Sequence, residues 1–141
     1  MKESPTPASF AFQNHLIRKV SFSQPLLNQE NVSIEFEPAG EYNQQEGTYK
    51  LILRFFGNYG DKNEHTLIDL VSEGYFKFDK NISFEEIPDY FFPNSIAILY
   101  PYLRAFVTTF TSVANAKALI LPTLNLSSLS KPLKENTTVI N

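Results

Sequence analysis

The stretch that decides the fold runs from Pro93 to Leu126 and reads PNSIAILYPYLRAFVTTFTSVANAKALILPTLNL. Its only charged residues are Arg104 and Lys117, so it predicts one long apolar helix followed by a short apolar run that Pro122 interrupts. A surface helix buries one apolar stripe and exposes the rest to water. This helix offers no polar face of normal width, so it needs a second partner: another chain, a ligand or a membrane.

The composition limits the class of protein. The chain has 141 residues, of which 43% are hydrophobic and 19% charged, and this fits one globular domain with one core. Its net charge of −3 argues against nucleic-acid binding, which needs a basic surface. The absence of cysteine excludes disulfides and thiolate metal sites and fits a cytoplasmic location. Pro101, Tyr102 and Arg104 interrupt the apolar stretch, so no membrane insertion is expected.

Four segments upstream of the helix predict strands, because apolar and polar side chains alternate along them: 15–24, 32–37, 48–56 and 65–78. The glycines and asparagines of residues 57–63 predict a hairpin turn between the third and fourth segments. Gly74, inside the fourth, predicts a bulge or a close approach of backbones. Four consecutive strands followed by a helix predict an α+β fold with a four-stranded antiparallel sheet.

The two ends of the chain carry weaker patterns. Residues 1–9 hold two prolines and small polar side chains and are expected to form a disordered leader. A single domain is expected over residues 10–130, with the long helix capped by Asn94 or Ser95. From Ser127 onward the chain is polar and contains Pro132, so residues 131–141 are expected to form a flexible tail.

Few residues could carry catalysis. His15 and His65 are isolated from acids and nucleophiles at any telling spacing. Glu85, Glu86 and Asp89 form an acidic cluster in a loop, but no ligand motif accompanies it, so solvation explains it better. No phosphate-binding loop, nucleophile elbow or metalloprotease motif occurs. We therefore expect no enzyme, no metal site and no cofactor.

The aromatic residues are the more informative set. Thirteen phenylalanines and seven tyrosines exceed what one contact between a sheet and a helix requires. They fit a core with a subunit interface, and they equally fit an apolar groove for extended, unfolded peptides of varied sequence. A small-molecule or lipid carrier with an aromatic pocket, and a structural assembly protein without a ligand, are the competing functions.

Three segments near the long helix resemble the SecB protein-export chaperone family. Phe92–Ile96 (FPNSI) and Leu99–Arg104 (LYPYLR) are similar to the family's C-P-N-I-L-F-P-Y-A-R pattern, and Leu121–Leu126 (LPTLNL) is similar to its L-A-P-V-N-F run. Weaker similarities extend the resemblance over most of the chain. Val20–Phe22 resembles the family's I-S-F in the first strand, and Ser72–Phe76 resembles its Q-x-G-x-F in the fourth.

The resemblance implies a homotetramer, a dimer of dimers with the long helix at its centre. It implies an ATP-independent holdase that binds unfolded precursor polypeptides in an apolar groove and passes them to SecA for export. By position, the residues expected to line this groove are Phe36, Phe76, Phe78, Phe91, Phe92 and Tyr100. Those expected at the oligomer interface are Ile68, Leu70, Ser72, Tyr102 and Phe106.

The sequence departs from the family pattern where SecA binds. Family members carry acidic residues around the I-S-F strand, whereas this chain has Lys19 and Ser23; Asp69 alone matches an acidic SecA-contact position, on the fourth strand. The family's C-terminal amphipathic helix and tail have no counterpart in residues 127–141. The resemblance therefore supports the peptide groove better than the SecA contact, and a SecB-like chaperone of a non-export client such as an antitoxin remains an alternative.

Overall fold

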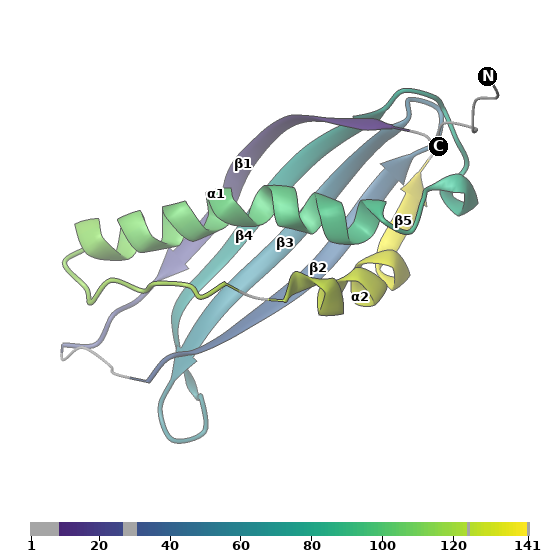
Figure 1. The fold of residues 1–141 in the computed structure, drawn as a ribbon. Coiled ribbons are helices and arrows are strands. Elements are labelled where there is room, and N and C mark those ends of the chain that lie inside the picture. The colour runs from purple at the N-terminus through teal and green to yellow at the C-terminus, as the bar shows by residue number, and fades with distance from the viewer. Residues whose placement is uncertain (1–8, 27–30, 124, 141) are drawn as a thin grey trace.

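A computed structural model describes residues 9–26, 31–123 and 125–140, and it has one sheet with helices on one of its faces (Figure 1). Its elements are β1 (Phe10–Phe22), β2 (Ser33–Asn43), β3 (Thr48–Tyr59), β4 (His65–Phe78), η1 (Phe84–Glu86), α1 (Phe91–Val113), η2 (Leu126–Leu129), α2 (Ser130–Glu135) and β5 (Thr137–Ile140). The strand order in the sheet is β1-β4-β3-β2-β5. The four predicted strands and the long helix are confirmed.

Alternation along the central strands separates the two faces of the sheet. Tyr49, Leu51, Leu53 and Phe55 of β3 are fully buried and face α1, while the residues between them lie on the opposite face. No helix of the described chain covers that opposite face, which we call the open face (Figure 1). The sheet therefore buries one side within the chain and leaves the other accessible.

The prediction of a purely antiparallel four-stranded sheet is wrong, because β5 adds a fifth strand that runs parallel to β2. It lies within residues 131–141, for which we expected a flexible tail. Helix α2, which carries the fully buried Leu133, positions this segment beside β2. A four-residue strand is too short to show a recognisable alternation, and a polar sequence around Pro132 masks the helix before it. The predicted leader, apart from Ser9, lies outside the described residues.

Strand β1 contains two irregularities that change which side chains face the core. The pairing with β4 shifts between Phe12 and Asn14 and again between Ile17 and Lys19, as β-bulges do. As a result Ile17 packs against the core together with Val20, instead of lying on the opposite side as strict alternation predicts.

Helix α1 begins at Phe91, three residues before the predicted cap at Asn94. Its buried positions recur every three or four residues and include Ile96, Leu99, Leu103 and Val107. The accessible side of α1 carries small or mixed side chains, among them Ala97, Pro101, Tyr102, Ala105 and Thr109, which are exposed. No helix or strand of the described residues packs on this side.

Gly74 explains how closely α1 approaches the sheet. A Cβ atom at Gly74 would lie 3.3 Å from Cδ1 of Leu99, tighter than most real Cβ contacts. The prediction of a bulge or a close approach of backbones at Gly74 is wrong, because the strand pairing has no register shift there and the close contact comes from a helix side chain that packs onto β4. The absent side chain of Gly74 leaves room for Leu99 of α1.

Candidate functional site

Most of the residues predicted to line a client groove form the centre of the core. Phe91 is fully buried, and its ring centroid lies 4.7 Å from that of Tyr49, 4.9 Å from that of Phe78 and 5.6 Å from that of Phe76. Phe92 belongs to the same cluster, 5.6 Å from Phe91. These edge-to-face and tilted contacts are the geometry that aromatic rings prefer in cores. The four predicted phenylalanines are therefore brought together, but they offer no surface to a client in this conformation.

Phe36 differs from the other predicted groove residues, because it alone among the six is not buried. Its ring lies 5.3 Å from Phe55 and 5.8 Å from Tyr100, so it joins the core at one end and reaches the surface at the other. Tyr100 itself is buried and donates its hydroxyl to the carbonyl of Pro122 at 2.7 Å. Phe36 is thus the predicted groove residue that remains accessible.

Phe36 lines a hollow of about 640 Å³ at the edge of β2, which we call the β2 hollow. Its lining residues are Phe36, Glu37, Pro38, Ala39, Ile52, Arg54, Val71, Pro132 and Asn136. Six of these nine residues are apolar, and the ion pair between Glu37 and Arg54, 3.6 Å apart, also lines the hollow. An open hollow with mainly apolar walls is suited to apolar side chains of varied shape.

Asp69, the predicted SecA contact, lies on the open face and is paired within the chain. Its carboxylate accepts hydrogen bonds from Nε and Nη2 of Arg54 at 3.0 and 2.7 Å. These bonds hold the pKa of Asp69 below its ordinary value, against the smaller opposing effect of burial. A partner that binds Asp69 would have to compete with Arg54.

The residues predicted at the oligomer interface fall into two groups. Ile68, Leu70 and Ser72 are buried under α1, and the Ser72 hydroxyl donates to the carbonyl of Leu53 at 2.9 Å, so these three positions are not on an accessible surface. The alternation of residues along β4 correctly placed these three side chains on one face of the strand, but that face packs against the core. Tyr102 is 43% exposed and Phe106 is half-buried, so both are accessible on α1.

The accessible side of α1 carries its own hollow. About 470 Å³ lies between α1 and the segment that follows it, lined by Tyr100, Pro101, Arg104, Ala105, Thr108, Thr109 and Ile120. Ile120 is 69% exposed and Val113, at the end of α1, is 80% exposed. On the other side of the helix, Tyr102 stacks on His15 with ring centroids 4.0 Å apart. We call the accessible side chains of α1 and of the segment after it, from Tyr102 to Ile120, the α1 surface.

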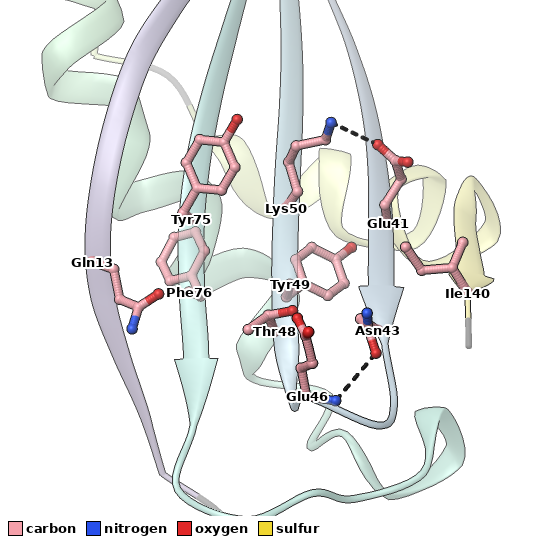
Figure 2. A pocket seen from close by; sticks show the side chains of 10 residues that line it. All are labelled: Gln13, Glu41, Asn43, Glu46, Thr48, Tyr49, Lys50, Tyr75, Phe76 and Ile140. Carbon is pink, nitrogen blue, oxygen red and sulfur yellow. Dashed lines mark hydrogen bonds and ion pairs between the residues drawn. The ribbon is translucent and has the colours of Figure 1, made fainter.

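A third hollow, of about 350 Å³, lies near β5 and is lined by polar, charged and aromatic side chains (Figure 2). Lys50 and Glu41 form an ion pair of 2.9 Å there, and the side chain of Ile140 reaches the hollow from β5. Glu46 is the second carboxylate of its lining, and no histidine lines it. We place no client in this hollow, because three charged side chains contribute to its walls.

The histidine and acidic side chains of the described residues are dispersed. No group of three or more histidine or acidic side chains among them is placed to hold a metal ion. His15 stacks on Tyr102, and His65 stacks on Tyr59 with ring centroids 5.1 Å apart. Helix α1 is long and apolar enough to cross a membrane, but core helices of soluble proteins meet the same criterion, and α1 packs on the sheet here.

A polar cluster on the open face was missed by the sequence analysis. Arg18, the residue at the second irregularity of β1, donates from Nη2 to Oε1 of Glu73 at 2.7 Å, and the Tyr75 hydroxyl donates to the same oxygen. Glu73 is only 5% exposed. The hydrogen bond from Arg18 keeps the pKa of Glu73 below its ordinary value although burial opposes it. The β-bulge at Arg18 directs its guanidinium toward Glu73. The alternation of apolar and polar residues in a sequence does not reveal where a bulge lies.

We expect Glu73 to make stability depend on pH. Because its folded-state pKa is lowered, its stabilising contribution is present above the unfolded-state pKa of about 4.3 and is lost as the pH falls through the folded-state pKa. Glu73→Gln should lower the melting temperature at pH 7 by a few degrees and reduce the loss of stability between pH 6 and pH 3. Thermal unfolding at several pH values, with the exposed Glu35→Gln as control, tests this; equal losses in both variants would contradict it.

Comparisons with known proteins agree with this architecture. No family model matches the chain. An uncharacterised protein of Methanocaldococcus jannaschii is 28% identical over an alignment of 151 positions that covers 94% of this chain and 90% of that protein. A SecB-like chaperone of Mycobacterium tuberculosis, solved in complex with a ChAD peptide from the HigA1 antitoxin, matches with a TM-score of 0.68 and 17% identity over 82% of this chain and 91% of that one. The chain therefore has a SecB-like fold, an α+β architecture with a mixed five-stranded sheet and one long helix.

Proposed function

We propose that this protein is an ATP-independent holdase chaperone that binds unfolded polypeptides and has no catalytic activity. The observation that carries this proposal is the SecB-like fold, shared over 82% of the chain with a chaperone that was solved with a bound peptide. The accessible apolar surfaces described above support it. A holdase needs apolar area open to water, because its clients expose apolar side chains in no fixed sequence.

The β2 hollow is the client site in this proposal. It joins the accessible Phe36 to apolar side chains of the open face, Ile52 and Val71. Burial of apolar area at such a site favours binding by about 25 cal/mol per Å² before the entropic costs of association. Binding whose free energy comes mainly from buried apolar area discriminates little between client sequences, as a holdase requires.

The α1 surface is the subunit contact in this proposal. Its small side chains, such as Ala105 and Thr109, allow two helices to approach closely, and exposed Tyr102 adds aromatic area. We propose a homotetramer, a dimer of dimers, with α1 at its centre. Association would remove from water the apolar side of α1 that the chain leaves uncovered.

The client class has two candidates. Export precursors handed to SecA in the cytoplasm are one, but Lys19 and Ser23 replace the expected acidic residues, and Asp69 is paired with Arg54. A non-export client such as an antitoxin is the other, and it is favoured by the antitoxin peptide bound to the Mycobacterium tuberculosis neighbour. Of the two, we propose the non-export client.

Suppression of aggregation tests the holdase proposal. A reduced, unfolded model protein should aggregate more slowly, by light scattering at 360 nm, when the chaperone is added without ATP. Heat-inactivated chaperone is the control for nonspecific crowding. An unchanged rate of aggregation at a several-fold molar excess of chaperone would overturn the proposal.

Ala105→Arg should dissociate the proposed tetramer. Ala105 is exposed on α1, so an arginine there fits the single chain but would place a charge inside a contact between helices. We expect sedimentation or light scattering to show a smaller species with unchanged secondary structure. The control is Asp61→Arg, in the turn between β3 and β4, which should keep the parental mass. A parental mass for Ala105→Arg would remove α1 from the subunit contact.

A further inference from the structure

We propose that the free half of the β2 edge binds an extended polypeptide as an added strand, parallel to β2 and in line with β5. This inference rests on the proposed chaperone function and specifies how the client backbone is held. The preferred segment alternates apolar and basic residues. The polypeptide bound at this edge is a segment of a client, and we expect it to pair with β2 in the way that β5 does.

Strand β5 shows that this edge accepts a parallel strand. The amide of Gly40 donates to the carbonyl of Asn136 at 3.1 Å, and the amide of Gln44 donates to the carbonyl of Ile140 at 3.3 Å. Thr137 contacts the Tyr49 hydroxyl at 2.7 Å, so its side chain points toward the core face. A Cβ atom at Gly40 would lie 2.0 Å from that hydroxyl, so the glycine makes room for this contact.

Strand β5 occupies only the last four of the eleven residues of β2, so Ser33–Ala39 pair with β3 on one side but with no described strand on the β5 side (Figure 1). The pairing of β2 with β3 has no register shift, so the amides and carbonyls that point toward the β5 side recur at every second residue. By this alternation from Gly40, the groups of Ile34 and Phe36 point to the free edge. Pro38 has no amide, and its carbonyl accepts from Nδ2 of Asn136 at 3.5 Å, which marks the boundary with the β5 segment.

The side chains along the free edge predict the composition of the added segment. On the core face, the half-buried Phe36 presents apolar surface at the β2 hollow, beside the buried Pro38. On the open face, Glu35 and Glu37 lie along the same edge, and both are exposed. An added strand places successive side chains on alternate faces. Apolar side chains therefore suit its core face, and lysine or arginine suits its open face.

The pairing geometry of β5 also fixes which amides of a parallel ligand face β2. Asn136, directly before β5, and Ile140, at the end of β5, direct their carbonyls toward β2, while the side chain of Ile140 lies at the hollow shown in Figure 2, on the open face. Residues with open-face side chains are thus the ones that hydrogen-bond to β2. In a parallel ligand the basic residues would make these bonds, whereas in an antiparallel ligand the apolar residues would make them.

A set of three peptides tests the inference with the full, unmodified protein. The probe is a fluorescein-labelled peptide of seven residues that alternates lysine with valine, and binding is measured by fluorescence anisotropy. One variant carries N-methyl groups on two inner lysines, and the matched control carries them on two valines. Methylation of the lysines should weaken binding by about tenfold, because two hydrogen bonds are lost, and methylation of the valines should change it little.

The outcomes separate this inference from the proposed function. If methylation of the valines, rather than of the lysines, weakens binding, the parallel orientation is overturned. If all three peptides bind equally well, strand addition is overturned. If aggregation of an unfolded client is suppressed but the unmodified peptide does not bind, the edge site is overturned and the chaperone function stands. Failure in both assays would overturn the proposed function itself.

Discussion

Phe91→Ala should destabilise the protein by about 3–5 kcal/mol and lower its melting temperature by roughly 10–20 °C. Phe91 is fully buried at the start of α1, where it contacts the aromatic rings of three strands: Phe10 of β1 at 4.8 Å, Tyr49 of β3 and Phe78 of β4. Its removal leaves a cavity between helix and sheet that rigid neighbouring rings cannot fill. Thermal and urea unfolding followed by circular dichroism would measure the effect.

Val113→Ala is the matched control for this prediction, because Val113 lies on the same helix but is 80% exposed. Its substitution should change stability by no more than about 0.5 kcal/mol. A similar loss in both variants would show that general helix propensity, rather than the aromatic cluster, fixes α1 to the sheet. A loss below about 1 kcal/mol for Phe91→Ala would contradict the central place of this ring in the core.

Phe36→Ser should reduce client binding at least about tenfold while costing only about 1 kcal/mol of stability. Phe36 is half-buried and lines the β2 hollow, so its ring contributes accessible apolar area as well as contacts to Phe55 and Tyr100. Binding of an unfolded, labelled protein, titrated at a temperature well below the melting point of the variant, would measure the loss.

Phe22→Ser controls for the removal of a half-buried phenylalanine as such. Phe22 lies on β1, at the opposite side of the sheet from β2, and packs edge-to-face on Phe110 at 5.1 Å. We expect this variant to bind clients as the parent does, after a comparable loss of stability. Equal client binding by Phe36→Ser and the parent would remove the β2 hollow from the client site.

The elements with a long, regular pattern could be predicted from the sequence. Alternation over residues 48–56 and 65–78 identified β3 and β4, and the apolar stretch after Pro93 identified α1. The start of α1 was placed too late, because the aromatic residues Phe91 and Phe92 gave no capping signal. The helix begins there because both rings are buried, which is a tertiary effect that local propensity does not contain.

The features that depend on contacts distant in sequence could not be predicted. Strand β5 is four residues long and owes its conformation to β2, almost a hundred residues earlier in the chain. The bulge at Arg18 exists only in the register between β1 and β4, and with it the pairing of Arg18 with Glu73. Neither a short strand nor a register shift leaves a periodic signal in the sequence.

The candidate site was predicted in part. The aromatic residues were correctly expected to gather, but sequence cannot distinguish a ring that fills the core from one that lines a groove, since both are apolar positions on the same face. Phe76 and Phe78 lie in the core, so substituting them would test the fold before it tested client binding. Phe36 is only half-buried, and it lies on the part of β2 that β5 does not reach.

The most direct test of the chaperone function is the molar mass in solution, measured by light scattering with and without a reduced, unfolded client and without ATP. The proposed function predicts a mass near four chains, which increases by the mass of a bound client. A mass of one chain that does not change when the client is added would contradict it.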